Sequence, residues 1–362
     1  MAIFVNYYQS QSGVVRGGSV YTAMMAKKMR SHNVSVLNVS WQKQRFIPTP
    51  ISKYLTFPYQ RLAKQSRASL IHLPGPFNPG CLTFNSKVVT TFHDQVNYDF
   101  YTQPTRGQSL LRRLESLAAA RADYVITPSH FTAERTIARF PKFEGKIEVI
   151  YPGVEDVFFE TRSVAECDRT FKKLAIAPTT SFILFVGAAS PHKNHKRVVE
   201  AYAKLRRLHP ELKLIMVGNI RKRREFPALL QQLKEQQISP GTDVIIPKQK
   251  LSSRDLSALY QKAKTFLFPS LYEGWGIVVG EAFASGTPTV ISDIPVFQEC
   301  FASGALMVDP NSVDAMVAGV DALLTTPALA AHYQQKGYEL IKHRTWENTA
   351  KKTVSVYKKL SR

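Results

Sequence analysis

The sequence predicts an α/β protein built from two doubly wound, mostly parallel sheets. Its 362 residues suggest two domains, at roughly 100–200 residues per domain. Short β-rich runs alternate with helical patterns, which is typical of parallel strands joined by crossover helices. The same alternation occurs twice, on either side of the polar, charge-rich stretch 155–180. We therefore expect two Rossmann-like halves in one chain.

The first half begins with a strand over residues 3–7, where small runs of Val, Ile, Phe and Tyr favour extended backbone. A loop containing Gly13, Gly17 and Gly18 follows this strand. The remaining elements expected here are a helix over 19–30 and strands over 34–39, 88–92, 124–127 and 147–150.

The second half begins with the apolar run 182–187, which is typical of a buried strand. Ser252 and Asp255 stand at the spacing of a capping box, which marks the start of a helix. The other expected elements are a helix over 195–209 that Pro210 ends, a strand over 212–217, a helix over 227–237, a helix over 252–263, and then strand, helix and strand over 265–270, 277–285 and 289–292.

Composition excludes several classes of protein. Apolar residues make up 44% of the chain and charged residues 21%, which excludes disorder, collagen and coiled coil as the main structure. The longest apolar run, 182–189, is far shorter than the ~20 residues of a spanning helix. Cys81, Cys167 and Cys300 form no CxxC pair, which fits a reducing cytoplasm and offers no Cys-rich metal site.

The chain is strongly basic, with 48 Lys and Arg against 27 Asp and Glu and a net charge of +21. The excess is uneven, because no acidic residue precedes Asp94. Such a charge attracts nucleic acid, acidic lipid headgroups or phosphorylated substrates alike. Charge alone does not choose among these partners.

The most informative segment is 266–293, FLFPSLYEGWGIVVGEAFASGTPTVISD, in which a strand leads through a glycine-flanked loop into a helix. The glycines let the backbone approach a ligand, and the helix N-terminus favours an anion. The loop carboxylate Glu273 and the helical carboxylate Glu281 suit the hydroxyl groups of a sugar or ribose. Together they indicate a sugar-nucleotide site; the alternative is two solvated acids on a surface helix. The candidate donor-binding residues here are Gly274, Trp275, Gly276, Ile277, Val278 and Glu281.

This segment carries a resemblance to a known family. Glu273 and Glu281 form an E-x7-E pair within P-S-x-x-E-G-W-G-x-x-x-x-E-A-x-A-x-G-x-P, which resembles the retaining glycosyltransferase family 4 of the GT-B fold. Upstream, ILFVGAASPHKNHKRVVEAYAKL and LKLIMVGN resemble that family's phosphate-contacting strand, loop and helix and its next strand. VVTTFHDQ, ADYVITPSHFTAE and KIEVIYPGVEDVF look like landmarks of its N-terminal half. The resemblance is weakest over 40–84.

The resemblance implies two Rossmann-like domains facing each other across a cleft. Residues 1–160 would form the acceptor-binding domain and 161–340 the nucleotide-sugar-binding domain, while the helix within 341–362 would cross back to the first. The implied reaction moves a hexose, with mannose favoured, from a nucleotide diphosphate sugar to a saccharide or lipid-linked acceptor. Retention of anomeric configuration and a role in cell-surface polysaccharide or lipopolysaccharide assembly are implied as well.

The resemblance also implies roles for individual residues of the second half. Glu273 would bind hydroxyls of the transferred sugar, and Glu281 would bind the ribose. Lys193, with backbone N–H groups of residues 275–278, would neutralise the departing diphosphate. Preorganised donors aimed at developing charge are usually the largest catalytic contribution.

In the first half, Gly17 and Gly18 match the glycine turn that faces the donor phosphates. His93 matches the family's active-site histidine close to the sugar, where it would stabilise the sugar cation. Without the resemblance, a His before Asp is more often structural, and a Gly pair is an ordinary turn.

One departure from the family concerns the phosphate clamp. The family often carries an Arg in this loop, at places that here hold Ala188 and His192. Arg221, Arg223 and Arg16 are the candidates to replace it.

No metal and no other cofactor is expected, the nucleotide sugar being a substrate. The sequence has no pair of Asp residues at DxD spacing, no Walker A loop, no HExxH and no GxSxG. His192 and His195 flank Lys193, but two His without a third ligand make a poor metal site. Lys193 and the helix end would take the place of a cation.

A second region, 41–69, interleaves aromatic and basic side chains. This composition suits an anionic membrane surface, single-stranded nucleic acid, or an amphipathic element packed on its own domain. Because resembling enzymes often hold a lipid-linked acceptor in the first domain, we favour the membrane, with the protein cytoplasmic and peripheral on the inner face. The candidate acceptor or membrane patch comprises Trp41, Lys43, Arg45, Lys53, Tyr54 and Arg61.

Two alternatives remain at this stage. One is a nucleotide-sugar epimerase or a phosphorylase on the same fold. The other is a basic nucleic-acid-binding protein, for which the sequence offers no zinc-finger or RRM signature, so nucleic acid is not the expected partner.

Overall fold

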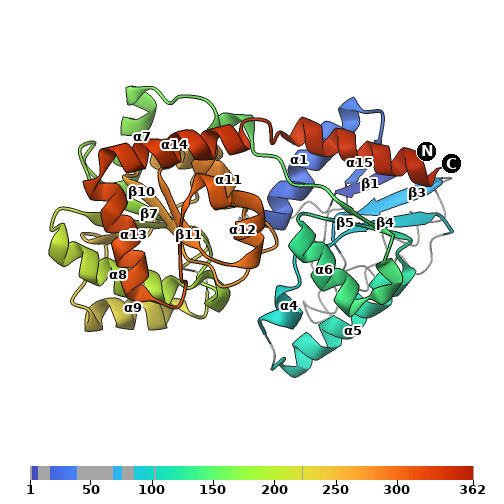
Figure 1. Cartoon of the computed structure of the whole chain (residues 1–362), viewed down its shortest axis with the longest axis horizontal. Helices are drawn as coiled ribbons and strands as arrows, with labels where there is room; N and C mark the ends of the chain where they lie inside the picture. Colours follow the sequence, from blue (N-terminus) through green and yellow to red (C-terminus); the bar gives the residue numbers. More distant parts are fainter. Residues whose placement is uncertain are drawn as a thin grey trace. The chain divides into compact units, whose positions relative to one another are not determined.

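A computed structural model describes residues 2–6, 17–38, 68–75, 85–101, 103–221 and 223–361 of the chain. It divides into two compact units. The first comprises Met1–Gly153 together with Arg344–Arg362, and the second comprises Val154–His343 (Figure 1). The chain thus changes unit shortly before residue 160 and returns shortly after residue 340.

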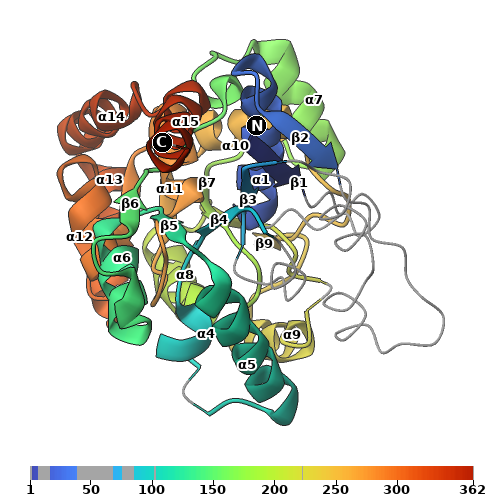
Figure 2. The same ribbon diagram turned by 90° about the vertical axis from the view of Figure 1, so that its right-hand side faces the viewer.

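The first unit contains a six-stranded sheet in which every neighbouring pair is parallel. Figure 2 shows this sheet, with the strands in the order β2-β1-β3-β4-β5-β6. The parallel α/β prediction is therefore confirmed for this half, although the sequence patterns did not single out β3. The strands are β1 (Ala2–Asn6), β2 (Ser35–Asn38), β3 (Leu70–Leu73), β4 (Lys87–Thr91), β5 (Tyr124–Thr127) and β6 (Ile147–Val149).

Helices of the first unit include one at each end of the chain. Gly17 and Gly18, expected in a loop, instead form the first turn of α1, so that prediction was wrong by a few residues. The helices among the described residues are α1 (Gly17–Ser31), α4 (Val96–Asp99), α5 (Arg106–Arg121), α6 (His130–Arg139) and α15 (Trp346–Leu360), with the short 3₁₀ turn η2 (Pro141–Phe143).

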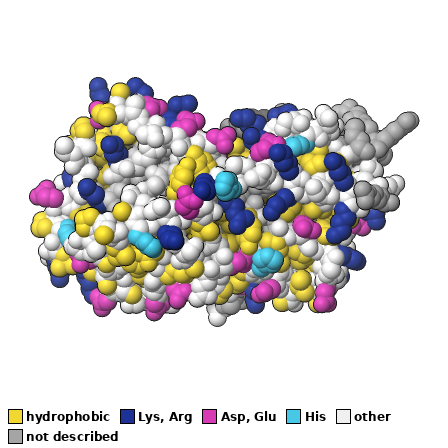
Figure 3. Space-filling model, turned by 45° about the horizontal axis from the view of Figure 1, so that its top comes forward, with side chains coloured by type: hydrophobic (Ala, Val, Ile, Leu, Met, Phe, Trp, Pro, Cys, Tyr) yellow, Lys and Arg dark blue, Asp and Glu magenta, His cyan; other side chains and the backbone are white. Residues whose placement is uncertain are grey.

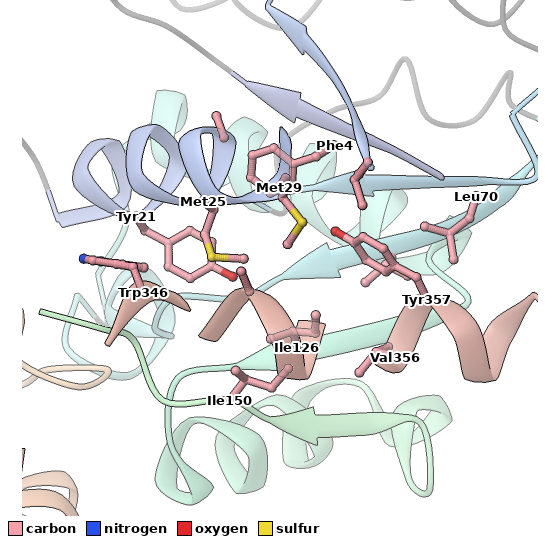
Figure 4. Close-up of a cluster of buried hydrophobic side chains, with 14 of the residues drawn as sticks. Phe4, Tyr21, Met25, Met29, Leu70, Ile126, Ile150, Trp346, Val356 and Tyr357 are labelled. Atoms are coloured by element: carbon pink, nitrogen blue, oxygen red, sulfur yellow. The ribbon is translucent and has the colours of Figure 1, made fainter. Parts of the chain in front are cut away.

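The C-terminal helix α15 completes the core of the first unit, where it packs beside α1 (Figure 4). Trp346 is buried, with its ring 5.6 Å from that of Tyr21 in an edge-on contact. A Cβ on Gly153 would lie 2.2 Å from the backbone nitrogen of Trp346, so only glycine allows this approach. Further along the helix, the Tyr357 hydroxyl lies 2.5 Å from Nδ1 of His72 on β3.

The second unit contains another six-stranded parallel sheet, in the order β12-β11-β10-β7-β8-β9. The strand β7 is buried throughout, as the apolar run 182–187 predicted, and β10 is buried as well. The strands of this sheet are β7 (Phe182–Val186), β8 (Lys213–Val217), β9 (Val244–Ile245), β10 (Thr265–Phe268), β11 (Thr289–Ser292) and β12 (Leu306–Val308).

Helices cover this second sheet, with α8 and α13 side by side in Figure 1. The capping box predicted at Ser252 and Asp255 is present at the start of α10.

The polar stretch 155–180, which the sequence suggested as the separation between the two halves, belongs to the second unit and is partly helical. It contains α7, which has its own capping box and buries Cys167 and Phe171. The helices are α7 (Val164–Leu174), α8 (His195–Leu208), α9 (Phe226–Glu235), α10 (Ser253–Lys262), α11 (Ile277–Ala284), α12 (Pro295–Phe301), α13 (Val313–Thr325) and α14 (Pro327–Ile341).

The surface carries the basic excess of the sequence. Figure 3 shows Lys and Arg side chains scattered over one face, with Asp and Glu between them. In the described part of the chain, no single helix is both long and apolar enough to cross a membrane; α13 and α14 reach that length only as a pair bent by 100°.

Candidate functional site

The second sheet has one topological switch point, between β7 and β10. The strand order runs outward in opposite directions from this pair, so the loops after β7 and β10 leave toward opposite sides. In open α/β sheets, ligands bind beyond the carboxyl ends of the strands at such a point. Lys193 follows β7 and Glu273 follows β10. Topology alone therefore selects this edge as the candidate site.

The loop after β7 is held in place by hydrogen bonds to its neighbours. It ends in the 3₁₀ turn η4 (Pro191–Lys193) and in Asn194, which adopts a left-handed conformation with φ of 60°. The Asn194 amide donates to the carbonyl oxygens of Pro269, at 2.9 Å, and Pro310, at 2.6 Å. Lys193 thus extends from a fixed backbone.

Lys193 and Glu273 form an ion pair across the switch point. The Ser270 hydroxyl donates to the same Glu273 oxygen, Oε1, at 2.8 Å. The Lys193 ammonium lies 5.3 Å from the centre of the Phe268 ring. The side chains of Lys193 and Glu273 keep 20% and 12% of their exposed surface, so both are held and yet accessible to a ligand. A carboxylate held in this way is a preorganised acceptor for hydroxyl groups.

The loop after β10 turns into α11 at Gly276, whose φ of 108° favours glycine. A Cβ there would lie 2.8 Å from Cε1 of Phe297. The Trp275 ring is buried 5.2 Å from that of Phe301, so its side chain serves the core and only its backbone is available to a ligand. The first N–H groups of α11 lack partners within the helix, which makes this end suitable for an anion.

Glu281 lies on α11 and is buried, with 7% of its surface exposed. The Tyr260 hydroxyl on α10 donates to its Oε2 at 3.2 Å. Burial, and then the charge of Glu155, raises the pKa of Glu281 to about 8, although the bond from Tyr260 lowers it. Glu281 is therefore largely protonated at neutral pH, when it both donates and accepts hydrogen bonds. The sequence alternative of two solvated surface acids is wrong for this residue.

Other basic residues of the second unit were candidates to complete the phosphate clamp. Burial, with the charges of Lys193 and Arg223, lowers the pKa of His192 to about 4, although the charge of Glu273 raises it. Arg221 donates from Nε to the carbonyl oxygen of Ile246 at 3.2 Å. Within the described ranges, no group of three or more His, Cys, Asp or Glu is arranged to hold a metal ion.

His93 lies in the first unit, directly after β4. Its Nε2 lies 2.9 Å from the carbonyl oxygen of Pro74, so Nε2 carries the proton and donates. Its ring meets that of Tyr21 edge-on at 4.7 Å. Burial lowers the pKa of His93, and the imidazole is therefore neutral at physiological pH. The Tyr21 hydroxyl lies 3.4 Å from that of Thr91.

Other predicted residues belong to the first unit or lie outside the described residues. Gly17 and Gly18 lie at the start of α1 in the first unit. Outside the described residues lie Arg16 and the whole candidate membrane patch, Trp41, Lys43, Arg45, Lys53, Tyr54 and Arg61.

Three residues that shape the site escaped the sequence reasoning. Ser270 and Asn194 stand within the quoted motifs, and their polar side chains next to the strand ends were the available signal. Tyr260 lies on α10 within a helical pattern, where nothing local distinguishes it from a core residue. Only the packing of α10 against α11 brings its hydroxyl to Glu281.

Comparison with known proteins agrees with this arrangement. The profile described as "Glycosyl transferases group 1" matches residues 167–340, and "Glycosyltransferase Family 4" matches residues 15–157. The O-antigen chain mannosyltransferase B of Escherichia coli is 30% identical over 281 residues, which cover 76% of this chain and 71% of that relative. The chain belongs to glycosyltransferase family 4.

Solved structures support the fold of this family member. Sucrose-phosphate synthase from Thermosynechococcus elongatus has a TM-score of 0.78 at 18% identity and covers 99% of this chain and 98% of its own. HepE of Anabaena, in complex with UDP-glucose, has a TM-score of 0.76 at 15% identity and covers 99% of both chains. The family 4 chain is therefore a glycosyltransferase with the GT-B fold. Membership of this class favours a transferase over the epimerase, the phosphorylase and the nucleic-acid-binding protein considered from the sequence.

Proposed function

We propose that this glycosyltransferase moves a hexose from a nucleotide diphosphate sugar to a saccharide or lipid-linked saccharide, with retention of anomeric configuration. The observation that carries the proposal is the Lys193–Glu273 ion pair at the switch point of the second sheet. The pair places an ammonium group suited to a phosphate beside a carboxylate suited to sugar hydroxyls.

In this proposal, the donor binds the second unit through groups already oriented. Glu273 accepts hydrogen bonds from hydroxyls of the transferred sugar, because its Oε1 is fixed by Ser270 and Lys193. Lys193 and the N-terminus of α11 bind the diphosphate, with Gly274 and Gly276 letting the backbone approach. Glu281, protonated and held by Tyr260, binds the ribose hydroxyls.

The proposed reaction is attack of the acceptor on the same face that the diphosphate leaves. The bond between the anomeric carbon and the phosphate oxygen breaks, the bond to the acceptor oxygen forms, and the acceptor proton passes to the departing phosphate. Glu273 supports this route because its ion pair and its hydrogen bond from Ser270 suit a positioned acceptor better than a covalent nucleophile. Neutral His93 would stabilise the developing positive charge on the sugar and would not act as a base.

Mannose is the favoured sugar, and assembly of a cell-surface polysaccharide such as O antigen is the favoured process. The support is the relative of 30% identity, whose name describes an O-antigen chain mannosyltransferase. We further propose that no metal is needed, because Lys193 and the helix end supply the positive charge that the leaving diphosphate requires.

Membrane association is proposed for the first unit. The patch within 41–69 lies outside the described residues, but α5 offers a second surface of the same kind. Leu110 and Leu117 on this helix keep 48% and 51% of their surface exposed, and Arg106 and Arg113 share their face. A face of Leu and Arg suits an anionic bilayer, such as the cytoplasmic leaflet that would carry a lipid-linked acceptor.

The first test is donor hydrolysis without acceptor, measured as released nucleoside diphosphate in the presence of EDTA. GDP-mannose, UDP-glucose, UDP-galactose and UDP-N-acetylglucosamine form the panel. We expect the wild type to consume one donor and Glu273→Gln to lose about 100-fold or more of that rate. Glu235→Gln, at an exposed position at the end of α9, is the matched control and keeps the wild-type rate.

A donor that is consumed only without EDTA would contradict metal independence. If no donor is consumed, the melting temperature of the protein measured with each donor of the panel tests whether it binds nucleotide sugars. The absence of any stabilisation would refute the proposed substrate class.

A further inference from the structure

One arginine of the second unit has a buried guanidinium nitrogen that is not hydrogen-bonded in the described part of the chain. Arg223 stands in the loop between β8 and α9, and its Nε is buried without a hydrogen-bond partner among the described residues. The nearby arginines are engaged: Arg221 donates to the Ile246 carbonyl and lies over the Phe226 ring, at 5.4 Å. Leaving a buried donor unpaired is unfavourable, so Arg223 is suited to an external acceptor.

The loop that carries Arg223 starts in direct contact with the loop that carries Lys193. Strands β7 and β8 are paired up to their last residues, and the Gly187 amide donates to the Val217 carbonyl at 2.8 Å. Gly218 has a φ of 139°, and a Cβ on it would lie 2.2 Å from the Gly187 oxygen. Only glycine at position 218 allows the two backbones to meet this closely. Both loops therefore leave the same edge of the sheet together.

Charges of the second loop also act on the residues around Lys193. His192 and His195 flank that lysine in the sequence, and each is influenced by the second loop. Burial lowers the pKa of both histidines; the charge of Arg223 acts on His192, and that of Glu225 acts on His195. Arg223 is thus a cation of the second loop whose charge reaches His192, the neighbour of Lys193 in the sequence.

The groups at this edge supply less positive charge than a bound diphosphate requires. Lys193 is balanced by Glu273, and the N-terminus of α11 supplies only about half a positive charge. A nucleoside diphosphate carries at least two negative charges. We propose that Arg223, together with Lys193, binds the diphosphate of the donor, its guanidinium donating from Nε and an Nη group to phosphate oxygens. This inference rests on the proposed function.

A guanidinium suits this position better than an ammonium. Its planar fork donates two parallel hydrogen bonds to a phosphate, whereas Lys presents a single charge. Arg223 then supplies from the β8 loop a charged, two-donor group that neither Ala188 nor neutral His192, in the β7 loop, provides.

The test measures binding of UDP, GDP, UMP and GMP to the full-length chain by titration calorimetry. The variants are Arg223→Gln, Arg223→Lys and Lys193→Gln. Arg224→Gln is the matched control, because Arg224 is the adjacent residue, is 84% exposed and is paired with Glu225. A thermal melt of each variant verifies that it folds.

We expect the wild type to prefer one diphosphate over its monophosphate. Arg223→Gln should weaken diphosphate binding about 10- to 100-fold and change monophosphate binding much less, with partial recovery in Arg223→Lys. Arg224→Gln should leave both affinities unchanged. A purely structural role for Arg223 would weaken both nucleotides equally.

Three results overturn the inference in distinguishable ways. If Lys193→Gln loses the diphosphate preference while Arg223→Gln keeps it, the role of Arg223 is refuted and the proposed function stands. If Arg223→Gln and Arg224→Gln behave alike, no specific contact exists. If the wild type binds none of the four nucleotides, the proposed function itself fails, and the inference fails with it.

Discussion

Two carboxylates of one motif lie eight positions apart in the sequence but in different environments. Glu273 is paired with Lys193 and remains partly exposed, whereas Glu281 is buried beneath Tyr260. The difference follows from their elements, because one stands in a loop and the other on the inner face of α11. The same residue type is thereby suited to a sugar hydroxyl in one place and to a ribose in the other.

Glu281→Gln should be more stable than the wild type at alkaline pH and similar to it at acid pH. The pKa of Glu281 is about 8 in the folded chain and lies near 4.5 when unfolded. The free energy of unfolding of the wild type therefore falls as pH rises from 4.5 to 8. Over this range the unfolded chain releases the Glu281 proton, whereas the folded chain keeps it. Glutamine does not ionise, so the variant avoids this loss.

Thermal melts of both proteins from about pH 5 to about pH 9 would measure the difference, which should reach on the order of 3 kcal/mol. Glu235→Gln, with an exposed side chain, should follow the wild type at every pH. A gap between Glu281→Gln and wild type that stays constant with pH would contradict burial of a neutral acid.

At the scale of elements, the start of α11 depends on a single glycine. Gly276 has a positive φ and stands against Phe297, whereas Gly286, just after the same helix, has a φ of 67° with no atom within 4 Å of an added Cβ. Both ends of this short helix require left-handed backbone, but only the first is also crowded. The crowded end is the one that faces the proposed diphosphate.

Gly276→Ala should destabilise the second unit more than Gly286→Ala. Alanine at Gly286 adds backbone strain of about 1–2 kcal/mol, and alanine at Gly276 adds a clash of about 1–3 kcal/mol to a comparable strain. Urea denaturation measures both variants. Equal losses would show that the contact with Phe297 relaxes freely, and the crowding argument would then be wrong.

At the scale of the whole molecule, the net charge of +21 acts over a long range, but specific association needs a surface with apolar groups as well. The scattered cations in Figure 3 give a general attraction to anions. The exposed face of α5 adds two leucines to that attraction.

The double variant Leu110→Ser/Leu117→Ser should bind vesicles containing phosphatidylglycerol at least about tenfold more weakly than the wild type, because two apolar side chains no longer enter the bilayer. Sedimentation with vesicles of phosphatidylglycerol and phosphatidylcholine measures this, at low and high salt. The matched control is Leu208→Ser/Leu230→Ser, which removes two exposed leucines from the second unit.

Equal binding by both double variants would remove α5 from the proposal. Binding that ignores phosphatidylglycerol altogether would refute association with an anionic membrane.

The sequence by itself determined the parallel α/β class, most strands, the helices α1 and α8 to α11, and the motif that contains Glu273 and Glu281. These follow from local periodicity, capping and turn residues, which act over a few positions. The short strands β3, β9 and β12 and the helix α7 were missed, because short runs and mixed polar segments give weak local signals. The helices α4, α5, α6, α12, α13 and α14 were not predicted either.

Only the tertiary structure decided which side chains meet. The pairing of Lys193 with Glu273, the bond from Tyr260 to Glu281 and the approach of Gly218 to Gly187 all join residues distant in sequence. Such contacts depend on the order of strands in the sheet and on the packing of one helix against another. No local pattern encodes them, since each partner is compatible with many neighbours until the sheet has formed.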